Sequence, residues 1–170
     1  IFWRLAFPHQ ELEMLSNKRC LKKILKMIKK LRDTQKWNFL SSYYIKTLFL
    51  WEVEEKRSSP EFWRQSEGFL FLYMLRKLRD CLQQKRIKFF WHKDCNLLET
   101  ISDTKIDHGL RMLNKIIDAI VKDALTVESY LVSDKDKYVF VSNDSQEECN
   151  ETSMQGGSTA ESSFSNCVIT

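Results

Sequence analysis

Residues 18–51, KRCLKKILKMIKKLRDTQKWNFLSSYYIKTLFLW, decide the fold. In the first half, leucines and isoleucines recur at the spacing of one helical face, while lysines occupy the other faces. In the second half, two serines precede a run that is apolar almost all round, which predicts a largely buried helix. Either Ser41 or Ser42 can cap that helix. We therefore expect a cationic helix beside a buried one.

The composition bounds the rest of the chain. It has 170 residues, of which 43% are hydrophobic and 29% charged, as is usual for one globular domain with a core. Only four glycines and two prolines interrupt it, which favours long helices over a many-turned β fold. The predicted fold is mainly α: a helical-bundle lobe over residues 1–134, with one short N-terminal strand, and a disordered polar and acidic tail over residues 135–170.

The N-terminal run IFWRLAF, residues 1–7, is apolar and strand-like but has no partner strand downstream. We therefore expect this chain to be the C-terminal part of a larger protein. No apolar run reaches the roughly 18 residues that a membrane-spanning helix needs. The five cysteines include no C-x-x-C pair, so they signal neither a zinc site nor a disulfide framework. This cysteine usage favours a reducing, cytoplasmic location.

Charge is unevenly distributed along the chain. Residues 18–36 hold nine basic side chains against the single Asp33, whereas residues 139–170 hold five acidic side chains and no basic one. The formal net charge of +4 hides this contrast. The two ends are therefore expected to meet different partners.

Three helices are predicted outside residues 18–51. Residues 8–15 form a short one, with Pro8 in its first turn. Ser59 and Pro60 supply a cap and a first turn for a core helix from residue 61 to about residue 84. Asp103 can cap the last. Its apolar face is predicted to hold Ile106, Leu110, Leu113, Ile117, Ile120 and Ala124.

Several short motifs together carry a resemblance. They are Arg32-Asp33, LSSYYIKT at residues 40–47, Trp63 and CNLLE at residues 95–99. With these motifs the chain resembles the cyclic GMP-AMP synthase-like (Mab-21) nucleotidyltransferase family, and most of all its animal cGAS-like receptors. The run WRLAF at residues 3–7, followed by His9 and Glu11, is similar to the family's entry into its C-terminal helical lobe. The resemblance covers roughly residues 1–125.

The resemblance implies a two-lobed enzyme whose helical lobe closes a nucleotide cleft. The N-terminal lobe, expected upstream of this chain, would carry a Gly-Ser loop and three carboxylates that hold Mg or Mn. Carried over by position, Tyr43 stacks on a nucleotide base, Ser42 and Lys29 contact the donor triphosphate of ATP or GTP, and Lys46 lies on the same motif. An aromatic face and lysine charges suit this chemistry. From the residues alone, a core Tyr43 and a solvated Lys29 remain the alternative.

Lys22 and Lys26 fall where family members that sense double-stranded nucleic acid place backbone-contacting lysines. A basic helix face suits a ladder of phosphates, although such a face can also be only solvated. The DNA-sensing vertebrate enzyme carries a zinc insertion here, whereas this chain has a short interval with Cys20 alone. The resemblance therefore implies double-stranded RNA rather than DNA, and no zinc. Tyr44 replaces a histidine common in the family, which leaves the nucleotide preference open.

These features predict the C-terminal lobe of a cGAS-like nucleotidyltransferase, whose parent joins ATP and GTP into a cyclic dinucleotide in innate immune signalling. This chain alone is expected to be inactive, since it lacks the catalytic carboxylates. Glu52-Val53-Glu54 and Gly156-Gly157-Ser158 imitate the family's carboxylate pair and catalytic loop, but in the wrong context. The alternative is a non-catalytic Mab-21-type scaffold that binds a protein partner.

The terminal sequence CVIT, residues 167–170, has the form of a prenylation box, although Thr is not a favoured last residue. No polybasic patch precedes it, so a single prenyl group would bind a membrane only weakly. Membrane contact is therefore expected only if Cys167 is lipidated.

Overall fold

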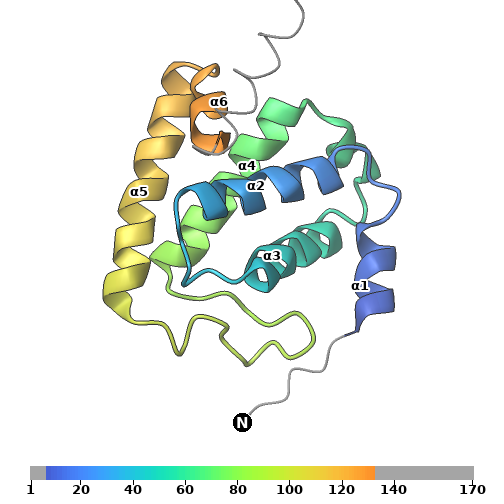
Figure 1. The fold of residues 1–170 in the computed structure, drawn as a ribbon. Coiled ribbons are helices and arrows are strands. Elements are labelled where there is room, and N and C mark those ends of the chain that lie inside the picture. The colour runs from blue at the N-terminus through green and yellow to red at the C-terminus, as the bar shows by residue number, and fades with distance from the viewer. Residues whose placement is uncertain (1–6, 133–170) are drawn as a thin grey trace, which may run out of the picture. The chain divides into compact units, whose positions relative to one another are not determined.

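The computed structural model of this chain describes residues 7–132 and has the mainly α-helical fold that the sequence predicts (Figure 1). Its elements are α1 (Pro8–Leu15), α2 (Leu21–Thr34), α3 (Ser42–Glu55), the 3-10 helix η1 (Pro60–Arg64), α4 (Glu67–Gln83), α5 (Asp103–Lys122) and α6 (Thr126–Leu131). The strand expected over residues 1–7 lies outside the described residues except for Phe7. The tail over residues 135–170, and the boundary before it, also lie outside and stay predictions.

Helix α2 has the two-faced character expected of it. Its buried residues are Leu21, Ile24, Leu25, Ile28 and Leu31. Burial of each such side chain is worth about 1.5–3 kcal/mol. The lysines at positions 22, 23 and 26 are exposed, so one face packs and the other is cationic.

Helix α3 is buried nearly all round, as predicted. Its buried residues are Tyr44, Ile45, Thr47, Leu48, Phe49, Leu50, Glu52 and Val53. Of the two candidate capping serines, Ser41 is the cap, because its hydroxyl accepts a hydrogen bond from the Tyr43 N–H at 3.2 Å. Ser42 is then the first helical residue and is exposed.

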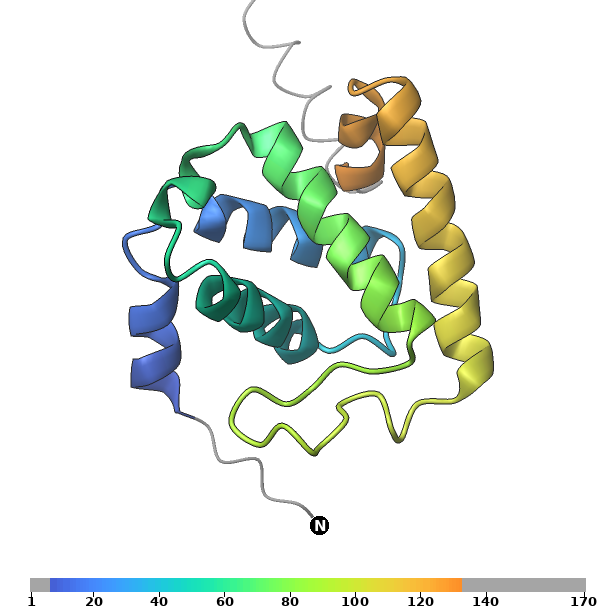
Figure 2. The ribbon, with the colours of Figure 1, turned by 180° about the vertical axis from the view of Figure 1, so that it is seen from behind.

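Helices α2, α3 and α4 contact one another and form the centre of the bundle (Figures 1 and 2). Helix α1 packs on α3, and α5 runs along α4. Large side chains fill the space between these elements. Phe49 of α3 stacks on Trp63 of η1 with 6.2 Å between ring centroids, and both are almost fully buried. Within the described residues, no helix combines the length and the apolar character needed to cross a bilayer.

The core helix predicted from residue 61 to about residue 84 is confirmed from Glu67 to Gln83 as α4, but its predicted start at residue 61 is wrong. Pro60 starts only the short η1, and Gln65 then has an extended backbone that ends it. Ser66 begins α4 by accepting a hydrogen bond from the Phe69 N–H at 3.3 Å. A second serine cap therefore divides the segment. Phe69 in the first turn of α4 is 46% exposed.

Helix α5 is close to its prediction, with two corrections. Its N-cap position is Ser102, so Asp103 is the first helical residue rather than the cap. Ala124 lies beyond the end of the helix and is exposed, and Leu110 is only partly buried. The buried face consists of Ile106, Gly109, Leu113, Ile116, Ile117 and Ile120.

Helix α6 was not predicted, because it is only six residues long and none of them is buried. It nevertheless packs on α2. The Thr34 hydroxyl donates to the Tyr130 carbonyl oxygen at 2.7 Å, which ties the C-terminal end of α2 to α6.

The segment between α4 and α5 doubles back on itself around Asn96. The Asn96 side chain accepts the N–H groups of Ile87 at 3.0 Å and Leu98 at 3.1 Å, and it donates to the Lys85 carbonyl oxygen at 2.9 Å. An isolated antiparallel bridge joins Lys88 to Asn96. The resulting turn, residues 88–96, carries Trp91 to α1, where its indole N–H reaches Glu11.

Candidate functional site

Tyr43 lies in the first turn of α3 and is only partly buried. Its hydroxyl donates to Glu11 Oε1 at 3.2 Å, and its ring centroid is 6.2 Å from that of Phe89. Lys46 follows one turn later, with its Nζ 5.3 Å from the centre of the Tyr43 ring. Such a position permits a cation–π interaction. The Tyr43 ring is thus not sealed in the hydrophobic core.

Glu11 on α1 holds this group of side chains together. It is 2% exposed, forms an ion pair with Lys46 and accepts the Trp91 indole N–H at 3.1 Å. Burial raises the pKa of Glu11, but hydrogen bonds from Lys46, Trp91 and Tyr43 and the charge of Lys46 outweigh it, so the pKa is below its ordinary value. Glu11 is therefore a buried carboxylate that stays ionised.

Sequence reasoning did not assign this role to Glu11, because its partners are far away in the chain. One local signal was present. Glu11 and Leu15 are four residues apart on α1, and both are buried, so they share the face that packs on α3. A carboxylate on an apolar helix face implies a buried cationic or hydrogen-bonding partner.

Lys29 on α2 is partly buried and is close enough to Lys46 for their charges to interact. Burial lowers the pKa of Lys29, the nearby charges of Lys46 and Arg32 lower it further, and Asp33 opposes them. Asp33 itself is paired with Arg32, whose Nε donates to it at 2.8 Å. Among residues 7–132, no carboxylate forms an ion pair with Lys29. Since Lys46 is paired with Glu11 and Arg32 with Asp33, Lys29 is the cation of this group that has no ion-pair carboxylate within residues 7–132.

Ser42 is exposed at the start of α3, and Ser41 takes the capping role. The first turn of α3 contains no acidic residue. A helix N-terminus without such a carboxylate attracts phosphate through its free N–H groups and its dipole. The structure thus associates Lys46 with both Tyr43 and Lys29, and it places Ser42 next to Tyr43 at this helix end. Their roles in nucleotide binding stay predictions.

Lys22 and Lys26 are exposed one turn apart on α2. Neither forms an ion pair with another described residue. The neighbouring Lys23 pairs with Glu67 at 2.5 Å and is therefore partly neutralised. The nucleic-acid role of Lys22 and Lys26 stays a prediction, and the geometry leaves both ammonium groups accessible.

Two of the best-defined cavities in the described part of the chain lie away from the residues predicted to bind nucleotides. One lies between residues 17–22 and η1, and the other between residues 35–39 and the first turns of α5. Neither is lined by Lys29, Ser42, Tyr43 or Lys46.

Glu52 and Glu54, which imitate the family's carboxylate pair in sequence, do not form a metal-binding pair in the structure. Glu52 is 3% exposed, accepts the Tyr73 hydroxyl at 2.9 Å and pairs with Lys77 at 2.8 Å. Glu54 is exposed. Residues 7–132 contain no group of three His, Cys, Asp or Glu side chains that could hold a metal ion. Residues 156–158 and Cys167 lie outside the described residues.

Comparison with known proteins gives a consistent match over the same helices. The family described as Mab-21 protein HhH/H2TH-like domain matches residues 20–116. A cyclic GMP-AMP synthase-like receptor from Trichogramma pretiosum is 39% identical over 79% of this chain and 29% of the relative. Receptors of that name from Aethina tumida and Ctenocephalides felis are 36% and 33% identical over 75% and 77% of this chain. The chain spans about a third of the length of these relatives.

Proposed function

This chain belongs to the cyclic GMP-AMP synthase-like (Mab-21) nucleotidyltransferase family, and we propose that it forms the nucleotide-facing side of the C-terminal lobe of a cyclic dinucleotide synthase. The full-length parent would join ATP and GTP into a cyclic dinucleotide. We further propose that the parent acts in the cytoplasm as a sensor in innate immune signalling, as the word receptor in the names of its relatives suggests.

One observation carries the nucleotide proposal. The partly buried ammonium of Lys29 lies near Lys46 and Arg32 and has no ion-pair carboxylate among the described residues. A triphosphate would relieve this repulsion. The Tyr43 ring lies beside Lys46 and offers a π-face to a base, and such stacking is worth about 1–3 kcal/mol. Ser42 is the first residue of α3, so its hydroxyl lies at the same helix end as Tyr43.

The metal of the reaction requires residues that the described part of this chain does not supply. Two-metal phosphoryl transfer needs carboxylates that bring the ions to the attacking hydroxyl and the donor phosphate. Residues 7–132 do not fit this requirement, because no acidic cluster forms and Glu52 is already paired. We place the Mg or Mn ligands in the N-terminal lobe of the parent, which would be the partner of this lobe.

Double-stranded RNA is the proposed activator. The exposed lysines at positions 22 and 26 lie one helical turn apart on one face of α2, and neither forms an ion pair with another residue in the range 7–132. Each phosphate that they neutralise would release condensed counterions, so binding should weaken steeply with salt. Lys22 and Lys26 on α2 would thus bind RNA, while Tyr43 and Lys46 on α3 would bind nucleotides.

The experiment compares two sets of substitutions in the full-length protein, each expected to impair one activity and spare the other. The protein is supplied with ATP, GTP, Mg and duplex RNA. Tyr43→Ala should reduce cyclic dinucleotide formation while leaving RNA affinity unchanged. Lys22→Glu with Lys26→Glu should weaken RNA binding while leaving RNA-independent nucleotide binding unchanged. Lys115→Glu with Lys122→Glu, two exposed lysines of α5, is the matched control. A parent that makes no nucleotide product under any condition would favour the protein-binding scaffold, and a charge-reversed α2 that binds RNA normally would exclude the sensor.

A further inference from the structure

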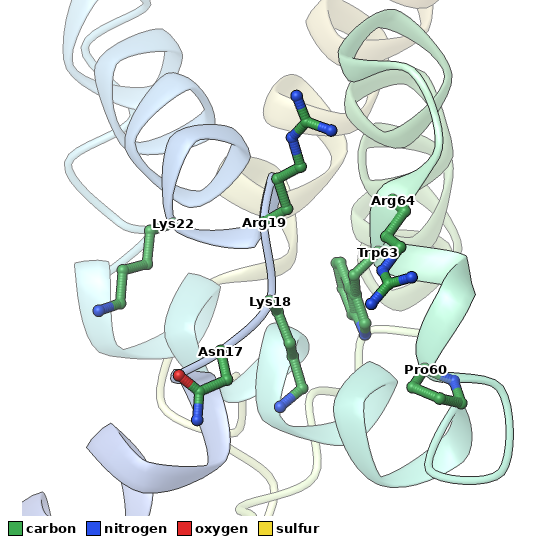
Figure 3. A pocket seen from close by; sticks show the side chains of 7 residues that line it. All are labelled: Asn17, Lys18, Arg19, Lys22, Pro60, Trp63 and Arg64. Atoms are coloured by element: carbon green, nitrogen blue, oxygen red, sulfur yellow. The ribbon is translucent and has the colours of Figure 1, made fainter.

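A cavity of about 460 Å³ lies where the connection before α2 meets η1 (Figure 3). We call it the Trp63 pocket. Its lining comprises Asn17, Lys18, Arg19, Lys22, Pro60, Trp63 and Arg64. Four of these residues are cationic, and the lining, all within the described part of the chain, contains no acidic residue. The nearby Lys23 is paired with Glu67, whereas no acidic side chain lines the pocket itself.

The N-terminal end of α2 adds to the positive potential of the Trp63 pocket. The helix has 14 residues, no acidic residue in its first turn and no side-chain cap at Cys20. The Cys20 N–H donates to the Trp63 carbonyl oxygen at 3.4 Å, which fixes η1 against this helix end. A helix terminus of this kind carries partial positive charge and unsatisfied N–H groups.

Trp63 provides an independent indication of a ligand. It is 1% exposed, and its indole nitrogen is buried without a hydrogen-bond acceptor among the described residues. Buried donors are nearly always paired, so an orphan needs an explanation. The ring cannot turn to find a partner, because it stacks on Phe49 and meets Phe62 edge-on at 5.2 Å. An acceptor oxygen supplied by a ligand would satisfy this N–H.

The ammonium group of Lys18 is held in place by backbone carbonyl groups at the end of α1. Its Nζ donates to the carbonyl oxygens of Met14 at 2.5 Å and Ser16 at 3.2 Å. An ammonium has three donors, so one remains for a ligand. In Figure 3 the Trp63 ring lies between the side chains of Lys18 and Arg64. Arg64 adds a guanidinium fork that can grip two oxygens of one group.

We propose that the Trp63 pocket binds a phosphoryl group, with Arg64 and Lys18 as its charged donors and the indole N–H of Trp63 as its neutral one. The group is the phosphate of a nucleic acid that continues from Lys22 along α2, or that of a free polyphosphate. Both sources present the same tetrahedral cluster of anionic oxygens to the same donors. This site goes beyond the proposed nucleotide and RNA contacts, since it adds residues from η1 and from the connection before α2.

The test measures binding of sodium tripolyphosphate to the full chain by calorimetry and thermal unfolding. Tripolyphosphate should raise the melting temperature of the wild type. Arg64→Gln, which removes the charge but keeps a polar side chain, should weaken affinity about tenfold, the usual effect of losing a charged hydrogen bond. Arg111→Gln, an exposed arginine on α5, should bind like the wild type.

Trp63→Phe is the second variant, because it keeps the buried ring and removes only the orphan N–H. Without tripolyphosphate, the melting temperature of Trp63→Phe should fall no further than is usual for a conservative substitution in a core. Added tripolyphosphate should raise its melting temperature by less than it raises that of the wild type. If this variant does not fold, Arg64→Gln still decides. Equal tripolyphosphate affinity in the wild type and Arg64→Gln, or no binding by the wild type, would overturn the site.

A second arm uses a short duplex RNA to identify the source of the phosphate. Competition between RNA and tripolyphosphate, with RNA affinity reduced in Arg64→Gln, assigns the pocket to nucleic acid. Unchanged RNA affinity in Arg64→Gln, with tripolyphosphate binding lost, assigns it to a free polyphosphate. Lys29→Gln removes the proposed triphosphate contact of the nucleotide site. Tripolyphosphate binding that persists in Lys29→Gln and falls in Arg64→Gln belongs to the Trp63 pocket, so failure of the nucleotide proposal would be distinguishable from failure of this one.

Discussion

The carboxylate of Glu11 on α1 forms a buried ion pair with Lys46 on α3. The Tyr43 hydroxyl and the Trp91 indole N–H donate to the same carboxylate, at 3.2 and 3.1 Å. Three segments that are distant in sequence therefore meet at one ionised group. Glu11 thus positions both the aromatic ring and the lysine that the family resemblance assigns to nucleotide binding.

Replacement of Glu11 by Gln should destabilise the protein by about 1–3 kcal/mol at neutral pH. Gln keeps the shape but removes the charge that compensates Lys46 in a site with little solvent. The figure is below the usual cost of breaking a buried pair because the Lys46 side chain is 28% exposed. Urea unfolding measures it. Glu13→Gln, an exposed change on the same helix, is the control and should cost almost nothing.

The same pair predicts a direction of pH dependence. The pKa of Glu11 in the folded protein is below its ordinary value of 4.5, so its stabilising contribution is complete above about pH 4.5. That contribution is lost as the pH falls through the folded pKa. The stability difference between the wild type and Glu11→Gln should therefore shrink on acidification below pH 4.5. A difference that stays constant or grows at low pH would contradict the ion pair.

Gly109→Ala should destabilise the protein, although alanine favours helices over glycine by about 1 kcal/mol. A Cβ at this position of α5 would lie 2.5 Å from Cζ of the Phe39 ring, and such overpacking costs about 1–3 kcal/mol. Gly68→Ala on α4 meets nothing within 4 Å and should be neutral or stabilising. Thermal unfolding distinguishes the two. In a Phe39→Leu background, Gly109→Ala should lose its cost, and a cost that persists would exclude the clash as its cause.

The sequence was sufficient for the elements whose signals are local. The alternation of leucines and lysines located α2, and the serine before an apolar run located α3. The break before α4 was not predicted, because Ser59-Pro60 and Ser66 are both plausible helix starts. In the structure the first begins only η1, which ends at the extended backbone of Gln65. A local sequence pattern can indicate where a helix starts, but it does not determine where that helix ends.

The candidate site was less predictable, for a different physical reason. The resemblance indicated Tyr43 and Lys46. It did not indicate the contact between Glu11 and Trp91, because these residues are far apart in the sequence and no helical or strand periodicity relates them. The cationic character of the Trp63 pocket was equally hidden, because Arg64 reaches it only through the turn that η1 makes. Contacts between distant segments depend on the tertiary fold and leave little trace in local sequence.

Cys81 should react slowly with alkylating agents. Burial, reinforced by the charges of Asp80 and Glu52 and opposed by Lys77, raises the pKa of the Cys81 thiol to about 11. At pH 8 the thiolate fraction is then about a hundredfold or more below that of an ordinary cysteine with a pKa of about 8.5. Mass spectrometry after iodoacetamide treatment gives the rate at this residue. Labelling of Cys81 in the folded protein as fast as in a peptide containing it would refute the raised pKa.

The most direct test of the nucleotide-binding proposal is the equilibrium affinity of the full-length protein for ATP and GTP in the presence of Mg. Tyr43→Phe keeps the ring and should bind within a few-fold of the wild type. Tyr43→Ala, with folding checked by its melting temperature, should raise Kd by about 5- to 150-fold, the loss expected for one stacked base. Nucleotide affinity in Tyr43→Ala equal to that of the wild type would contradict the assignment of this side of α3 to nucleotides.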